Sequence, residues 1–152
     1  MEELNLPQYN FRIRKENGRN EIFDLIRKKF VSLTPEEWVR QNFLMFLIKK
    51  KGYPESLITV EKSLMLNSLL KRTDLVIYSN TGLPKLIVEC KATSIKITQK
   101  SFDQIARYNM TLKVDYLIVT NGLTHFICQI DYKKKTYYFL KEVPFYDEIK
   151  NS

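Results

Sequence analysis

The stretch from Lys71 to Ala92 constrains the fold more than any other part of the chain, because it holds two short apolar runs around a polar break. The runs are Leu75–Tyr78 and Leu86–Val88, and the segment between them, residues 79–84, contains Asn, Gly and Pro. These residue types favour a reversal of chain direction. The stretch therefore predicts a β-hairpin.

The loop length sets the register of this hairpin. With Tyr78 opposite Lys85, counting outward along an antiparallel ladder places Val76 opposite Ile87. Two residues further out along this register, the pair is acidic.

That acidic pair consists of Asp74 and Glu89. Side chains alternate along a strand, so Asp74, Glu89 and Lys91 share one face of the hairpin. Directly opposed residues are about 5 Å apart at Cβ, and two like charges at that distance destabilise the pair. A divalent cation between the carboxylates would compensate, because Mg²⁺ prefers oxygen ligands. Lys91 would then point a positive charge at whatever the metal binds.

The order Asp74, fourteen residues, Glu89-x-Lys91 resembles the active-site signature of the PD-(D/E)xK nuclease superfamily. Within it, the chain is similar to the N-terminal domain of the R subunit of type I restriction enzymes, a family that also contains short stand-alone proteins. The segments that carry this resemblance are 34–41 (TPEEWVRQ), 71–75 (KRTDL), 88–92 (VECKA), Gln104 with Tyr108, and 120–122 (TNG). The tripeptide Glu-x-Lys alone is common in proteins. The resemblance therefore rests on all of these segments occurring together and in this order.

The resemblance implies an α/β (α+β) fold with a restriction-endonuclease-like core, in which helices flank a central mixed β-sheet. We expect the core over about residues 30–125, an N-terminal extension over 1–30, and an additional C-terminal hairpin and tail over 125–152. A length of 152 residues and an apolar content of 44% agree with one nuclease-like domain over 1–152. No Gly-rich phosphate loop occurs, so we expect no helicase motor.

The resemblance also implies a site. The expected catalytic residues are Asp74, Glu89, Lys91, Gln104 and Glu37. The expected metal ligands are Asp74, Glu89, the backbone carbonyl of Cys90 and, as a further carboxylate, Glu37. The cofactor would be Mg²⁺, with Mn²⁺ as a substitute.

A helix is predicted for residues 35–51. Thr34 can accept a backbone N–H as its N-cap, and Glu37 would complete a Thr-x-x-Glu capping box. Two roles are open for Glu36 and Glu37: both stabilise the helix start, or one of them, Glu37 before Glu36, reaches the metal. Arg40 either contacts phosphate or pairs with Glu36 four residues earlier.

A second helix is predicted for residues 99–111, where Gln104 and Tyr108 are neighbours on one side. The resemblance implies that Gln104 faces the site and orients water or phosphate; the alternative for both residues is an ordinary solvent-facing pair. Other segments predict strands, with residues 21–31 open between strand and short helix and 64–70 open between strand extension and helical turn. The expected strands are 57–61, 114–120, 125–130 and 136–140.

The positive net charge of the chain favours a polyanionic partner. Lys and Arg number 25 against 17 Asp and Glu, which gives a formal charge of +8 and agrees with DNA binding. The alternative is that these lysines only keep a basic protein in solution. The expected nucleic-acid contacts are Arg40, Arg72, Tyr108 and Lys96.

The two cysteines, Cys90 and Cys128, lie in apolar surroundings and read as reduced core residues, as in a cytoplasmic protein. No apolar run approaches ~20 residues, so no membrane partner is expected. His125 is the sole histidine, which argues against a His-based metal cluster and favours a structural role.

These patterns favour a Mg²⁺-dependent, endodeoxyribonuclease-like hydrolase that cuts DNA phosphodiesters, either as a homodimer or with other restriction or defence subunits. The first alternative is a non-catalytic DNA-binding or assembly module of a restriction or defence complex. The second is a purely structural protein in which Asp74 and Lys91 form a cross-strand ion pair.

Overall fold

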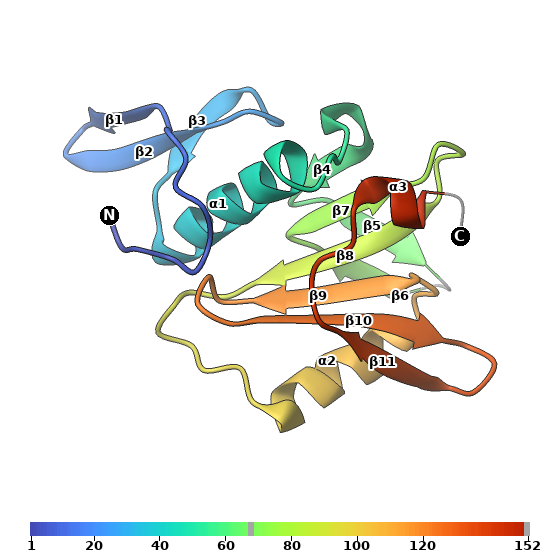
Figure 1. Ribbon diagram of the computed structural model, residues 1–152. Coiled ribbons are helices and arrows are strands. Elements are labelled where there is room, and N and C mark those ends of the chain that lie inside the picture. The colour runs from blue at the N-terminus through green and yellow to red at the C-terminus, as the bar shows by residue number, and fades with distance from the viewer. Residues whose placement is uncertain (67–68, 151–152) are drawn as a thin grey trace.

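A mixed β-sheet runs through the middle of the molecule, with helix α1 (Pro35–Lys49) on one face and helix α2 (Gln99–Met110) on the other (Figure 1). The computed structural model describes residues 1–66 and 69–150. The order of strands is β11 (Thr136–Leu140), β10 (His125–Asp131), β9 (Tyr116–Thr120), β8 (Pro84–Cys90), β7 (Leu75–Tyr78), β4 (Ile58–Val60). Only the β8–β9 pair among these is parallel, and α2 connects its strands. The predicted fold class, with a mixed sheet flanked by helices, is confirmed.

The predicted hairpin is formed by β7 and β8, with Val76 opposite Ile87 as expected. The register differs at the turn, where Tyr78 pairs with Pro84 and Lys85 is the extra residue of a β-bulge. A bulge redirects a side chain, and the ammonium of Lys85 lies 2.6 Å from the carboxylate of Asp115 while the residue is buried.

Alternate residues of the hairpin face opposite sides of the sheet. Leu75 packs into the core cluster beneath α1 with Phe43. Val76 and Ile87 pack into the cluster beneath α2 with Phe102. The alternation predicted from the sequence is therefore confirmed, and the sheet is covered on both sides.

Helix α1 begins where the sequence predicts and ends two residues earlier. The hydroxyl of Thr34 accepts the backbone N–H of Glu37 at 3.0 Å, so the predicted N-cap is present. The other half of the capping box is wrong, because the carboxylate of Glu37 turns instead to Arg40 and other donors. Gly52 follows the helix at φ +73°, a conformation that favours glycine.

An antiparallel N-terminal sheet lies beside the start of α1 (Figure 1). Its strands are β1 (Ile13–Glu16), β2 (Arg19–Asp24) and β3 (Lys29–Ser32), in that order. Asn17 and Gly18 form the first turn at φ 50° and 76°. The segment 21–31, open between strand and helix from its sequence, thus consists of strand, turn and strand.

Strand β4 follows a 3₁₀ turn (Glu55–Leu57) and falls within the strand predicted for residues 57–61. A separate antiparallel pair, β5 (Ser63–Leu66) and β6 (Leu69–Arg72), follows it. The segment 64–70 is therefore strand where it is described, and residues 67 and 68 lie outside the described residues.

The C-terminal hairpin of β10 and β11 extends the central sheet beyond β9. β9 is buried along its whole length, as its apolar sequence predicts. The chain then passes into α3 (Tyr146–Ile149), whose Tyr146 packs against Tyr53. Within the described part of the chain, no helix has the length and apolar character needed to cross a membrane.

Both cysteines are buried and free, as predicted. Burial raises the pKa of the Cys128 thiol to about 12. Such a thiol stays protonated near neutral pH and behaves as a small apolar group.

His125 contacts three segments of the chain: the N-terminal segment, the end of β9 and helix α1. Its Nε2 lies 2.9 Å from the carbonyl of Asn5 and must donate, because a carbonyl oxygen only accepts. Its Nδ1 lies 2.6 Å from the hydroxyl of Thr120, and its ring packs against Phe43. Burial lowers the pKa of His125, and the hydrogen bond to Asn5 offsets this only in part. The structural role predicted for this residue agrees with these contacts.

We expect His125 to make stability depend on pH. Its ordinary pKa is 6.5 and its pKa in the folded chain is lower, so the unfolded chain takes up the proton first. The contribution is present above the unfolded pKa and lost as the pH falls through the folded pKa. Urea unfolding should show the free energy of unfolding falling from about pH 7.5 to about pH 5.5, with a slope of at most roughly 1.4 kcal/mol per pH unit. His125→Gln should flatten this slope, and equal slopes in both proteins would contradict the assignment.

Candidate functional site

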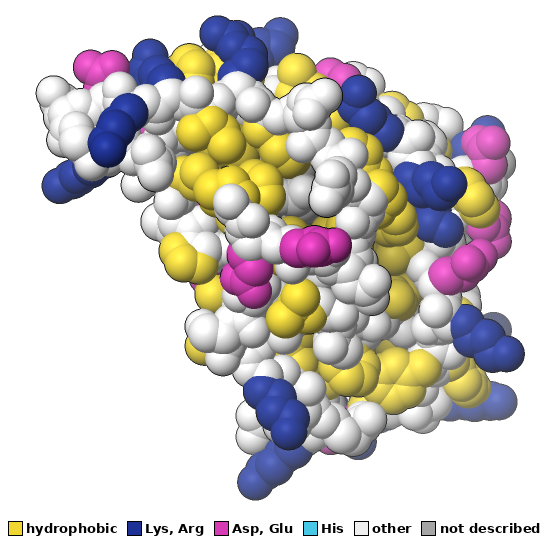
Figure 2. Space-filling view, turned by 60° about the vertical axis from the view of Figure 1, so that its left-hand side comes forward, with side chains coloured by type: hydrophobic (Ala, Val, Ile, Leu, Met, Phe, Trp, Pro, Cys, Tyr) yellow, Lys and Arg dark blue, Asp and Glu magenta, His cyan; other side chains and the backbone are white. Residues whose placement is uncertain are grey.

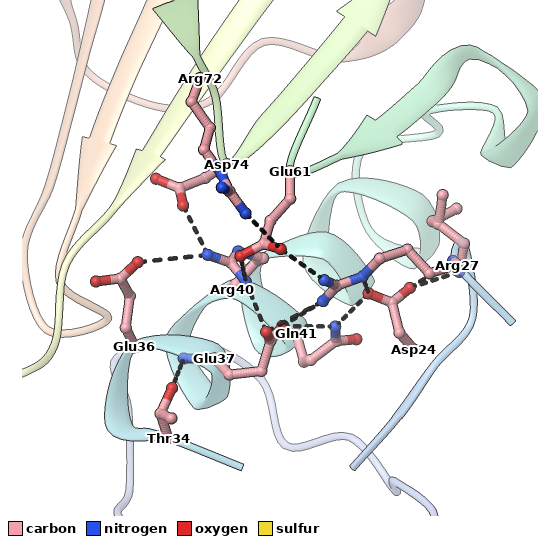
Figure 3. A network of polar contacts seen from close by, with 11 residues as sticks. Asp24, Arg27, Thr34, Glu36, Glu37, Arg40, Gln41, Glu61, Arg72 and Asp74 are labelled. Carbon is pink, nitrogen blue, oxygen red and sulfur yellow. Dashed lines mark hydrogen bonds and ion pairs between the residues drawn. The ribbon is translucent and has the colours of Figure 1, made fainter. Parts of the chain in front are cut away.

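Arg40 lies at the centre of a polar network where the start of α1 meets the ends of β4, β6 and β7 (Figure 3). Its side chain is only 5% exposed. Its guanidinium contacts the carboxylates of Glu36 at 3.3 Å, Glu37 at 2.6 Å, Glu61 at 3.2 Å and Asp74 at 2.8 Å. Both predictions for Arg40 concerned one partner, whereas the structure gives it four acidic partners, including the predicted Glu36.

Asp74 connects this network to β8. Its Oδ1 accepts from Arg40, and its Oδ2 accepts the backbone N–H of Cys90 at 2.8 Å. The residue directly precedes β7, so its carboxylate is fixed at the open end of the hairpin. Glu89 and Lys91 flank Cys90 in sequence, which places the three predicted residues around one strand end.

The backbone N–H of Cys90 points toward Asp74, at the edge of β8 that pairs with β7. In an extended strand, the N–H and C=O of one residue point to the same edge. The N–H of Cys90 points to Asp74, so its carbonyl faces the same side. The next N–H, from Lys91, points the other way and donates to the carbonyl of Thr120 on β9 at 2.8 Å.

Glu89 and Lys91 are half-buried. The ladder between β7 and β8 starts at the pair Leu75 and Val88, so Asp74 lies just outside it, while Glu89 follows Val88 on β8. A position of Glu89 directly opposite Asp74 stays a prediction. Among the described residues, no group of three or more His, Cys, Asp or Glu side chains could hold a metal ion.

A second guanidinium, from Arg27 in the turn between β2 and β3, completes the network (Figure 3). It contacts Asp24 at 2.6 Å, Glu37 at 3.1 Å and Glu61 at 3.0 Å. Gln41 donates to both Asp24 and Glu37 at 2.9 Å. The ion pairs of this network join five carboxylates (Asp24, Glu36, Glu37, Glu61 and Asp74) to three guanidinium groups (Arg27, Arg40 and Arg72), so these residues carry an excess of negative charge.

Sequence reasoning missed Asp24, Arg27, Gln41 and Glu61. One signal was available, because Asp24 interrupts an otherwise apolar segment and is fully buried. Its Oδ1 accepts the N–H groups of Ile26 and Arg27, a turn that Asp favours. The remaining contacts join residues far apart in sequence, which local patterns do not reveal.

The charges of the network stabilise one another. Burial raises the pKa of Asp24, but hydrogen bonds from Arg27 and Gln41 more than offset it, so its pKa lies below the ordinary value. Burial likewise raises the pKa of Glu61, and the charges of Arg40, Arg27 and Arg72 outweigh it, leaving that pKa lowered.

Arg40 shows the opposite balance. Burial lowers its pKa, but the hydrogen bond to Asp74 and the charges of Glu37 and Asp74 more than offset this, so its pKa is raised. The guanidinium of Arg40 is therefore charged at neutral pH.

The network opens into a groove of about 710 Å³. Arg27, Glu37, Arg40 and Glu61 line one part of it. Ala92, which directly follows Lys91, lines another. The groove therefore gives a ligand access to the network close to the end of β8.

The structure does not gather all of the predicted residues. Gln104 and Tyr108 are exposed on α2, which packs on the face of the sheet opposite to α1. Lys96 is exposed in the connection between β8 and α2. Arg72 joins the network through Glu61 at 3.3 Å, and its side chain is 72% exposed.

The basic residues form no continuous stripe on the face shown in Figure 2. Lys and Arg side chains lie mainly around its periphery, with hydrophobic side chains and two acidic ones nearer the middle. The formal charge of +8 therefore does not by itself mark a path for DNA on this face.

Comparisons with known proteins agree with this architecture. The family model described as the N terminus of type I restriction enzyme R proteins matches residues 35–144. A solved fragment described as an HsdR subunit of a type I restriction enzyme from Vibrio vulnificus YJ016 is similar to the chain, with a TM-score of 0.54 and 22% identity. The similarity covers 78% of this chain and 25% of that one, so the chain spans about a quarter of the length of that fragment. Among curated proteins, none matches significantly.

Proposed function

We propose, from the premise that the chain belongs to the family of type I restriction enzyme R protein N termini, that it is a Mg²⁺-dependent nuclease of the PD-(D/E)xK type that hydrolyses DNA phosphodiesters. The observation that carries the proposal is the hydrogen bond between Asp74 and the backbone N–H of Cys90. It brings the Asp of the signature to the strand end that bears Glu89 and Lys91.

Each residue has a role in this proposal. Asp74, Glu89 and the carbonyl of Cys90 would hold Mg²⁺, with Mn²⁺ as a substitute. The bound ion would polarise the scissile phosphate and lower the pKa of a bound water. Lys91 stabilises the charge that develops on the phosphate. Arg40 holds Asp74 in place, since the two are 2.8 Å apart.

Glu37 supports this arrangement through Arg40. Its carboxylate accepts from Arg27, Arg40 and Gln41, so its oxygens are already engaged. We therefore propose that Glu37 orients Arg40 instead of binding the ion directly. Gln104 and Tyr108 contact the substrate only if the bound DNA extends around the edge of the sheet to α2. The exposed side chains of Arg72 and Lys96 are proposed to contact DNA as well.

The described network also favours a second candidate, a non-catalytic DNA-binding or assembly module of a restriction or defence complex. The guanidinium of Arg40 already lies 2.8 Å from the carboxylate of Asp74 and supplies it with a counter-charge. Such a module would bind DNA without any metal. It would also act through partner subunits of the restriction or defence type.

Incubation with DNA separates the two candidates. The purified protein is mixed with supercoiled, linear and single-stranded DNA in Mg²⁺, in Mn²⁺ and in EDTA. We expect cleavage of at least one substrate in either metal and none in EDTA. Salt-sensitive DNA binding in EDTA with no cleavage in either metal would favour the module, and neither binding nor cleavage would exclude both.

A further inference from the structure

The N-terminal sheet reaches the candidate site through the turn that holds Asp24 and Arg27, and the guanidinium of Arg27 extends furthest into the network. The sheet spans residues 13–32, ahead of the family match that starts at residue 35. Arg27 comes from its second turn and is 16% exposed as a side chain. The contact therefore links a part of the chain outside the family match to the residues proposed for catalysis.

Arg27 is itself held firmly. Its Nε lies 2.6 Å from Asp24, whose side chain is fully buried. Asp24 also accepts the backbone N–H of Arg27 at 2.8 Å and the amide of Gln41 at 2.9 Å. With Nε fixed in this way, the two terminal nitrogens of the guanidinium project toward α1 and the end of β4.

Those two nitrogens hold the carboxylates that position Arg40. One of them contacts both oxygens of Glu37 at 3.1 Å, and the other contacts Glu61 at 3.0 Å. Glu37 and Glu61 then contact the same terminal nitrogen of Arg40, at 2.6 Å and 3.2 Å. Its other terminal nitrogen contacts Asp74 at 2.8 Å and, more distantly, the exposed Glu36 at 3.3 Å.

The Nε of Arg40 is buried and has no hydrogen-bond partner within the described part of the chain. Leaving a buried donor unpaired costs free energy. Because Nε makes no hydrogen bond, the contacts that hold this guanidinium all come from its two terminal nitrogens. Any loss of order in Glu37 or Glu61 would be transmitted to Arg40 and from there to Asp74.

We infer that Arg27 is a positioning residue for the candidate site, acting in the relay Arg27, Glu37 and Glu61, Arg40, Asp74. The inference rests on the proposed nuclease function for its catalytic consequence. Without Arg27, Glu37 and Glu61 have Arg40 as their shared cation, and Arg40 is drawn away from Asp74. The fork of an arginine is required, because a lysine cannot hold three carboxylates in a fixed planar geometry.

The NMR signal of the Cys90 backbone amide reports on the position of the Asp74 carboxylate, which accepts its N–H. It can be measured without DNA cleavage. The chain has two cysteines, so ¹⁵N-cysteine labelling gives two amide signals, and Cys128→Ala assigns them. Asp74→Ala supplies the position of the Cys90 signal when the carboxylate is absent. Cys128, buried beneath α2, serves as the internal control.

We expect both Arg27→Lys and Arg27→Met to move the Cys90 signal in the direction set by Asp74→Ala and to leave the Cys128 signal in place. Cleavage should lose roughly 10- to 100-fold in kcat with little change in KM for DNA, because Arg27 acts on the geometry of Asp74. Arg14→Met, which removes an arginine ion-paired with Glu21 at 2.8 Å on the same sheet, should change neither readout.

Full recovery of both readouts by Arg27→Lys would overturn the inference in favour of a role of charge alone. An unmoved Cys90 signal in folded variants would mean that Arg27 only links the N-terminal sheet to α1 and does not position Asp74. If Arg27→Met does not fold, Arg27→Lys decides the matter, since it keeps the charge. A wild-type protein that fails to cleave DNA would sink the proposed function, while the Cys90 signal would still test the relay.

Discussion

Lys91→Ala should lower metal-dependent DNA cleavage by roughly 10²–10³-fold, because it removes the positive charge proposed to stabilise the developing charge on the phosphate. The backbone of Lys91 is anchored by its N–H bond to Thr120, so the substitution leaves β8 in place. The measurement is single-turnover cleavage at saturating Mg²⁺. The loss should fall on kcat, with DNA binding in EDTA nearly unchanged.

The matched control is Lys49→Ala, which removes an exposed lysine at the other end of α1. Its cleavage rate should equal that of the wild type. Cleavage by Lys91→Ala at the wild-type rate would remove Lys91 from the site. A similar loss in both variants would point to a general effect of net charge.

Arg40→Met should destabilise the fold by about 3–5 kcal/mol, because it removes the counter-charge of Asp74 and one of the two guanidinium groups that contact the buried Glu37. The side chains of Arg40 and Glu37 are 5% and 8% exposed, so water cannot compensate for the lost partner. Urea unfolding at neutral pH measures the change in free energy. The Cys90 amide should shift as well, since Asp74 loses the bond to its Oδ1.

An exposed ion pair provides the contrast. Arg14 and Glu21 have side chains that are 48% and 24% exposed, and such pairs contribute roughly 0–1 kcal/mol. Arg14→Met should therefore cost at most about 1 kcal/mol. Equal losses in Arg14→Met and Arg40→Met would mean that the buried network adds nothing beyond an ordinary surface pair.

Local patterns predicted the hairpin and the helix start because each depends on residues close in sequence. The alternation of Leu75 to Tyr78, the turn residues that follow and the Thr34 cap are short-range features, and the structure contains them. The Lys85 bulge was not predictable in this way. It accompanies an ion pair with Asp115, thirty residues further along the chain, which local patterns do not reveal.

The candidate site was predictable in part for the same reason. The closeness of Asp74 to the end of β8 follows from the pairing of two strands that are neighbours in sequence. The partnership of Arg40 with Asp74 spans 34 residues, as does that of Arg27 with Glu61, and no periodicity encodes it. The glutamate of the predicted capping box, Glu37, lost its local role because buried guanidinium groups bind a carboxylate more strongly than a backbone N–H does.

A crystal structure of the wild-type protein grown with Mn²⁺ tests the central claim most directly, because the anomalous signal locates the ion. We predict one Mn²⁺ between the carboxylates of Asp74 and Glu89, close to the carbonyl of Cys90, with Arg40 still bound to Asp74. Strong anomalous density elsewhere, or none at saturating Mn²⁺, would contradict the account.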